Sequence, residues 1–162
     1  MQFKLVPAAP DDLEYVETVQ RAVPLVPGSE DDCCARIMRR TEIAPRDEAR
    51  TWLTFLRALE LAEEGPSGFT RTRRDPDPEH LRIAFRDRLY GVDRILEILA
   101  QADDPLSSEA VYDRFKDDVP TYEQYRWSER LEAVWSERLD RLLEWAVLLD
   151  LAERVDDGYR PA

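Results

Sequence analysis

Apolar residues recur at steps of three and four along most of the chain, and this spacing places them on one face of an α-helix. Val16, Val19 and Val23 form one such stripe. Ser29 and Ser107, each followed by acidic residues, mark helix starts because a serine hydroxyl accepts hydrogen bonds from the N–H groups of a first turn. The pattern predicts helices at 11–23, 30–41, 45–60, 79–101, 108–117 and 121–150.

The second half of the chain repeats part of the first. Residues 59–69 read LELAEEGPSGF and residues 149–159 read LDLAERVDDGY, a match at a constant offset of 90. In both segments an apolar helix ends near a Leu-x-Leu run, a glycine-bearing turn reverses the chain, and a strand with an aromatic residue follows. We therefore expect β-hairpins at 61–74 and 150–160, each directly after a helix.

Both halves then have the same order of elements, three helices followed by a hairpin. This order resembles the winged-helix fold, a relative of the helix-turn-helix DNA-binding modules. The resemblance rests on the element order and on the signature shared by residues 59–69 and 149–159. It implies a mainly α fold class with small β-hairpin wings, built from two tandem winged-helix modules.

Two prolines in the segment 75–78, Asp-Pro-Asp-Pro, exclude a helix there and set the expected boundary between the modules. Module 1 is expected at 1–75. Module 2, at 76–162, is expected to have an elongated first helix and an insertion before its last helix.

The elongated helix carries an apolar stripe that begins with Leu81, Phe85 and Leu89 and continues beyond Gly91, which permits a bend. The stripe is longer than one small module requires. We therefore expect its first half, through Tyr90, to pack on module 1 or on another subunit. Leu81, Phe85 and Leu89 are candidate partner contacts on this basis.

The insertion of module 2 contains the segment WSERLEAVWSERL, in which Trp127 and Trp135 lie eight residues apart. Eight residues turn an α-helix by about 80° beyond two full turns, so both indoles lie near one face. Either the two tryptophans pin the helix to its own core, or they form a partner-facing surface, for which tryptophan and arginine are typical residues.

The net charge of the chain bears on whether DNA is a possible partner. The 162 residues contain 35 Asp and Glu against 23 Lys and Arg, a net charge of −12, and only Lys4 and Lys116 are lysines. This composition resembles that of proteins from salt-loving microbes. At 1 M salt the Debye length is about 3 Å, so repulsion between an acidic protein and DNA is mostly screened. Acidity therefore does not exclude DNA here.

The third helix of module 1 has a cationic face. Arg46, Arg50, Thr54 and Arg57 follow one another at steps of four, four and three. The winged-helix resemblance implies that this helix enters the major groove, where arginine bonds guanine edges. Candidate phosphate contacts on the second helix and the hairpin are Arg36, Arg39, Arg40, Arg71, Arg73 and Arg74.

The second copy provides an internal comparison for this face. At the offset of 90 the four positions become Ser136, Asp140, Glu144 and Val147. Carboxylates would face phosphates there, so at most module 1 reads DNA.

The arginines of module 1 also have a second interpretation. They form a salt-bridged, solvated face paired with Glu42, Asp47 and Glu48, or they meet an acidic patch of a second subunit.

Patterns typical of catalysis and of metal binding are absent from the sequence. Cys33 and Cys34 are adjacent, His80 is the only histidine, and there is no phosphate-loop, nucleophile or zinc-ligand motif. We therefore expect no enzyme activity, no cofactor and no metal.

Since there is neither a stretch of about 18 uncharged apolar residues nor a signal-peptide pattern, we expect a cytoplasmic protein without a membrane partner.

Together these features predict a DNA-binding transcriptional regulator of a halophilic microbe. Module 1 would contact double-stranded DNA through its third helix and wing, and module 2 would serve assembly, as a homodimer or with a protein partner. The competing hypothesis is a protein interaction adaptor that keeps the winged-helix fold without binding nucleic acid, because fold alone does not decide function.

Overall fold

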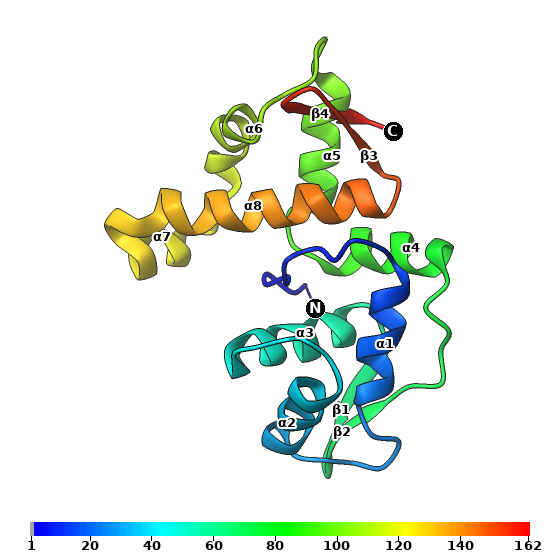
Figure 1. Ribbon diagram of the computed structural model, residues 1–162. Helices are drawn as coiled ribbons and strands as arrows, with labels where there is room; N and C mark the ends of the chain where they lie inside the picture. The colour runs from blue at the N-terminus through cyan, green and yellow to red at the C-terminus, as the bar shows by residue number, and fades with distance from the viewer. Residues whose placement is uncertain (1) are drawn as a thin grey trace. The chain divides into compact units, whose positions relative to one another are not determined.

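Two compact units make up the structure, a computed structural model that describes residues 2–162 (Figure 1). Unit 1 ends at Tyr90 and unit 2 begins at Gly91. The prolines of segment 75–78 predict an earlier boundary, at 75/76. The helix that follows the prolines instead belongs to unit 1, so each unit differs from the predicted module by this helix.

Unit 1 has the predicted order of three helices and a hairpin, followed by one more helix. Its elements are α1 (Glu14–Ala22), α2 (Glu30–Arg40), α3 (Arg46–Ala58), β1 (Ala62–Gly65), β2 (Gly68–Arg71) and α4 (Pro78–Arg88). The helix α2 packs on α1 and α3, and α4 packs on α3. Of the two packing partners expected for the first half of the long apolar stripe, module 1 is therefore confirmed.

Unit 2 has the same order with additional helical segments in the middle. Its elements are α5 (Val92–Gln101), α6 (Ser108–Phe115), the 3₁₀ helix η1 (Lys116–Asp118), α7 (Thr121–Trp127), the 3₁₀ helix η2 (Ser128–Arg130), α8 (Leu131–Leu148), β3 (Ala152–Val155) and β4 (Gly158–Pro161). The single helical stretch predicted at 121–150 is thus three segments. The break lies at Ser128, whose φ of 50° is in the left-handed region.

Gly91 separates two helices where the sequence predicts one helix at 79–101. α4 ends at Arg88 and α5 begins at Val92. Gly91 has a φ of 89°, and a Cβ at this position would lie 2.8 Å from Cζ of Phe115. The prediction of one elongated helix is therefore wrong, because the apolar stripe continues across a left-handed residue that ends the helical path.

The internal repeat is present in the backbone hydrogen bonds of both units. The residue before the N-cap of the second helix pairs with the aromatic residue of the hairpin, Gly28 with Phe69 in unit 1 and Leu106 with Tyr159 in unit 2. The two N–H···O distances are 3.0 and 2.8 Å in unit 1, and 2.9 and 2.8 Å in unit 2. Each hairpin therefore gains a short third strand at the same place.

The third helix also ends identically in the two units. The N–H of Leu61 donates to the carbonyl of Leu56 at 2.8 Å, and the N–H of Leu151 donates to Ala146 at 2.8 Å. The residue before each of these leucines, Glu60 or Asp150, is left-handed, with φ of 63° or 59°. The Leu-x-Leu signature thus marks a helix end that turns the chain into the first hairpin strand.

The cores of both units contain most of the residues that the sequence offers as partner contacts. Leu81, Phe85 and Leu89 are at most 1% exposed, and so is Trp135. Trp135 stacks on Phe115 at 5.9 Å between ring centroids. These four side chains are therefore core residues, and the prediction that they form a partner surface is wrong. A stripe that is apolar enough to bind a partner is also apolar enough to be the core.

Candidate nucleic-acid interface

The cationic face of α3 divides into two groups of arginines. Arg46 and Arg50, at its N-terminal end, contact the first turn of α2. Arg46 pairs with Asp31 and lies 3.9 Å from a carboxylate oxygen of Glu30, and Arg50 lies 3.3 Å from Glu30. Both guanidiniums remain half-exposed, at 44% and 51%.

The acids that meet these arginines differ in part from those the sequence suggests. Asp47 does pair with Arg50, at 3.5 Å. The closer partners come from α2, where the hydroxyl of Ser29 accepts the N–H of Asp32 at 3.1 Å and so begins the helix with acidic residues in its first turn. Acids are favourable at a helix N-terminus because they face the positive end of the helix dipole. The same acids then neutralise part of the α3 face.

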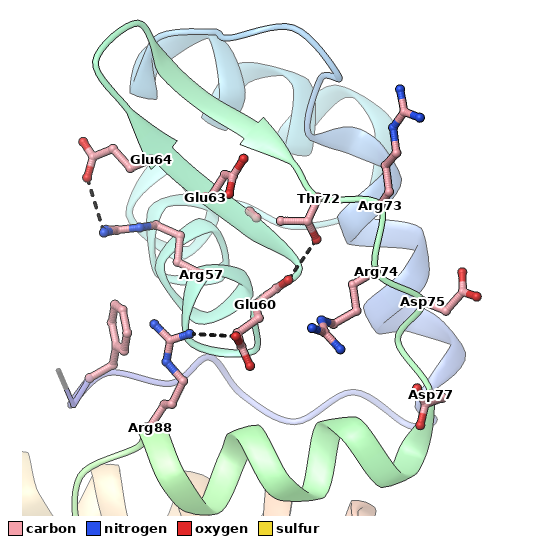
Figure 2. A pocket seen from close by; sticks show the side chains of 12 residues that line it. Arg57, Glu60, Glu63, Glu64, Thr72, Arg73, Arg74, Asp75, Asp77 and Arg88 are labelled. Atoms are coloured by element: carbon pink, nitrogen blue, oxygen red, sulfur yellow. Dashed lines mark hydrogen bonds and ion pairs between the residues drawn. The ribbon is translucent and has the colours of Figure 1, made fainter.

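Arg57, at the other end of α3, lies in a pocket at the base of the hairpin (Figure 2). Its guanidinium lies 3.4 Å from Glu64 of β1 and stacks on the rings of Phe3 and Phe69, at 5.6 and 5.7 Å. The pocket has a volume of about 920 Å³. Arg57 therefore connects the third helix to the hairpin.

The same pocket gathers further charges from unit 1 (Figure 2). Arg73 and Arg74 line it, together with Arg88, which the sequence does not single out. Arg88 also stacks on Phe3, at 5.5 Å, and pairs with Glu60 at 3.6 Å. Both arginine and carboxylate side chains line the pocket, so it is polar and of mixed sign.

His80 has a structural role beside this pocket. Its Nε2 lies 2.8 Å from the carbonyl oxygen of Leu59, and its Nδ1 lies 3.4 Å from the guanidinium of Arg74. A neutral ring that donates from Nε2 and accepts at Nδ1 satisfies both neighbours. His80 thereby fastens the start of α4 to the end of α3.

Four of the predicted phosphate contacts have side chains without a partner among residues 2–162. Arg39 and Arg40 are exposed at the end of α2, Arg71 is half-buried on β2, and Arg73 is exposed just after it. In Figure 2, Arg73 points away from Glu60. Arg36 differs, because its Nε donates to the carbonyl of Ala22 at 2.9 Å and so caps the end of α1.

Unit 2 has the same scaffold with different charges. Ser107 caps α6 as Ser29 caps α2, an offset of 78, and at this offset Arg39 and Arg40 correspond to Asp117 and Asp118. In the ion pair between the third helix and the hairpin, the positions of the acid and the base are exchanged. Glu144 of α8 accepts from Arg154 of β3 at 2.7 Å, whereas in unit 1 the helix supplies the arginine.

The two units therefore share three features in the same order: a capped second helix, a third helix ending in a Leu-x-Leu turn, and a hairpin joined to a third strand residue. The model of the halobacterial double winged helix domain matches residues 1–162. The chain belongs to this family. No curated protein and no solved structure matches the chain.

Membership in the halobacterial double winged helix family confirms the predicted fold class. The hairpins β1–β2 and β3–β4 are the two wings, and unit 1 and unit 2 are the two winged helices. The halobacterial description agrees with the acidic, arginine-rich composition. Within residues 2–162, no helix is long and apolar enough to cross a membrane.

Tyr159, in the second wing of this double winged helix, is expected to make the stability of the protein depend on pH. It is 4% exposed and donates its hydroxyl hydrogen bond to Glu144. Burial raises the pKa of Tyr159 above the usual value of 10.0, and the hydrogen bond to Glu144 and its charge raise this pKa further. Because the folded protein holds this proton longer than the unfolded chain, its stabilising contribution is complete below pH 10 and is lost above it.

We therefore expect the free energy of unfolding to fall faster above pH 10 in the wild type than in Tyr159→Phe. The difference in slope is at most about 1.4 kcal/mol per pH unit. Urea unfolding in molar KCl between pH 8 and pH 12 measures both slopes. Equal slopes above pH 10 would show that Tyr159 does not titrate differently in the two states.

Proposed function

We propose that the chain is a non-enzymatic, DNA-binding transcriptional regulator whose first winged helix contacts double-stranded DNA. The observation that carries the proposal is the set of partnerless guanidiniums in unit 1, within residues 2–162. Arg39, Arg40, Arg71 and Arg73 lack carboxylate partners in a chain with 35 acids and 23 bases. They lie on the second helix and the wing, elements from which winged-helix proteins contact the DNA backbone.

Phosphates can bind these arginines without breaking an existing ion pair. At molar salt the counterion contribution to binding is small, so direct contacts and base readout must supply the affinity. Close charge-assisted hydrogen bonds from guanidinium to phosphate persist when long-range fields are screened.

The arginines of α3 remain available to DNA in this proposal. Arg46 and Arg50 are half-exposed, and exposed ion pairs are worth about 1 kcal/mol or less. Replacing an arginine's contact with Glu30 by a contact with a guanine edge or a phosphate therefore costs little free energy. Arg57 is less available, since its guanidinium is 26% exposed and stacked on two rings.

A pull-down of fragmented haloarchaeal DNA in molar KCl tests the proposal. The wild type should enrich particular sequences, and Arg39→Gln with Arg40→Gln should remove most of this enrichment. The matched control is Arg114→Gln with Arg160→Gln, which removes the same charge from exposed residues of α6 and the second wing. We expect the control to enrich the same sequences as the wild type.

Absence of enrichment by the folded wild type would overturn the proposal. An equal loss in both double variants would also overturn it, because binding would then follow net charge and not the position of the arginines. Circular dichroism of each variant in the same buffer shows whether the fold is intact.

The second candidate function is a protein interaction adaptor without nucleic acid. It is favoured by the ion pairs of Arg46, Arg50 and Arg57, which leave no unpaired cation on the stripe of α3. The adaptor predicts no DNA enrichment in the pull-down and a stoichiometric protein partner that remains bound when Arg39 and Arg40 are changed.

A further inference from the structure

Unit 2 contains an open acidic groove where unit 1 has a closed one. In unit 1 the space between the first turn of α2 and the face of α3 is closed by Arg46 and Arg50, which contact Glu30 and Asp31. This arrangement shows which groups fit between the second and third helices of this fold. They are guanidiniums, donated from one side to carboxylates on the other.

The corresponding positions of unit 2 lack these cations. At the offsets of 78 and 90, Asp31 corresponds to Glu109, Arg46 to Ser136 and Arg50 to Asp140. A groove of about 640 Å³ lies here between α6 and α8, and no Lys, Arg or His lines it. We call it the α6–α8 groove; its acidic residues are Glu109, Asp113, Glu129, Glu132 and Asp140.

The carboxylates of the α6–α8 groove have little internal compensation. Among these five carboxylates only Asp113 has an ion-pair partner within residues 2–162, Lys116 at 3.9 Å. Tyr112 also lines the groove, and its pKa is raised by burial and then by Glu132 and Asp113. The groove is therefore an acidic surface in which like charges lie close together, and a cation entering it would relieve their repulsion.

The segment that unit 1 lacks presents such cations beside the groove. The offset rises from 78 before this segment to 90 after it, so twelve residues are inserted before α8. They include α7 and η2, which pack on α8 at the end opposite to the hairpin (Figure 1). We call part of this segment the α7 knob; it consists of the exposed residues Tyr122, Tyr125, Arg126 and Arg130 and the half-buried Trp127.

The α7 knob has the composition of a protein interface. Tyr125 is 83% exposed and Tyr122 is 55% exposed. Arg126 and Arg130 stack on the ring of Trp127, at 5.1 and 5.8 Å, and neither has a carboxylate partner within residues 2–162. Tyrosine, tryptophan and arginine are the residues that carry most binding energy at interfaces.

We propose that the α6–α8 groove receives Arg126 and Arg130 of a second copy of this chain. The α7 knob and the groove belong to one continuous surface, because Glu129 lies between the two arginines in sequence and lines the groove. A surface with a cationic knob beside an acidic groove is complementary to itself, so two copies exchange knobs in a symmetric dimer. The inference does not depend on DNA binding.

Charge-reversed variants test this dimer in molar KCl by light scattering after size-exclusion chromatography. The wild type should be a dimer. Arg126→Glu with Arg130→Glu should be monomeric, with the dissociation constant raised roughly 100-fold or more. Glu109→Arg with Asp140→Arg leaves the knob unchanged and should be monomeric as well. The control Arg114→Glu, an exposed residue of α6 outside the groove, should stay dimeric.

An equimolar mixture of the two reversed variants gives the decisive result. In a mixed dimer the acidic knob of one copy meets the basic groove of the other, and the second contact is the unchanged one. We expect the mixture to form a dimer that neither variant forms alone. A monomeric wild type, a dimeric reversed variant, or a mixture that does not associate would each overturn the inference.

Discussion

Replacing Glu123 with alanine is expected to lower the free energy of unfolding by about 3–5 kcal/mol. Glu123 of α7 is 3% exposed and accepts hydrogen bonds from Nε1 of Trp127 and from Arg138 at 3.3 Å. The guanidinium of Arg138 is 13% exposed and lies over the rings of Trp127 and Trp135. Without Glu123 the buried guanidinium of Arg138 has lost its counterion. Urea unfolding in molar KCl measures the resulting decrease in the free energy of unfolding.

Glu137→Ala is the matched control. Glu137 pairs with Arg141 at the same N–O distance of 3.3 Å, but the Glu137 side chain is 68% exposed. An exposed pair of this kind contributes about 0.5 kcal/mol. If the two variants lost equal stability, Glu123 would not be the buried group that holds α7 on α8.

Replacing Gly68 with alanine is expected to destabilise unit 1 by about 3 kcal/mol or more. Gly68 has a φ of 126°, and a Cβ there would lie 2.4 Å from the backbone oxygen of Gly28. The clash falls on the residue that pairs with Phe69, so relief requires breaking the contact between the wing and the segment before α2. Thermal unfolding in molar KCl measures the change.

Gly65→Ala, at the other end of the same turn, is the control. A Cβ at Gly65 meets nothing within 4 Å, so its effect should stay within about 1 kcal/mol. Similar losses for both glycines would mean that the turn is sensitive to any side chain, and that the close approach of Gly28 does not decide its conformation.

The order of helices and hairpins could be predicted from the sequence because the same pattern of residues occurs in both halves of the chain. The Leu-x-Leu run before each hairpin marks a helix that ends with a left-handed residue. Such a helix end depends on a few consecutive residues, so it can be recognised from the sequence. Where a left-handed residue lies inside a continuous apolar stripe, as at Gly91, the stripe alone predicts one helix instead of two.

The partners of the arginines could not be read from the sequence in the same way. The contact of Arg46 with Asp31 joins the starts of two helices, fifteen residues apart, and exists only once the helices have packed. Arg39 and Arg40, in contrast, follow one another at a helix end with no acid in the same turn, and these predicted residues stay exposed. Their assignment to DNA remains a prediction.

The salt dependence of DNA binding is the most direct test of the claim that the first winged helix carries the cationic surface. Fluorescence anisotropy on an enriched duplex gives the slope of log Kobs against log [KCl] for the wild type and both double arginine variants. Arg39→Gln with Arg40→Gln should reduce the magnitude of the slope by about 2, one for each lost phosphate contact, and Arg114→Gln with Arg160→Gln should leave it unchanged. The same slope for all three proteins would contradict the claim.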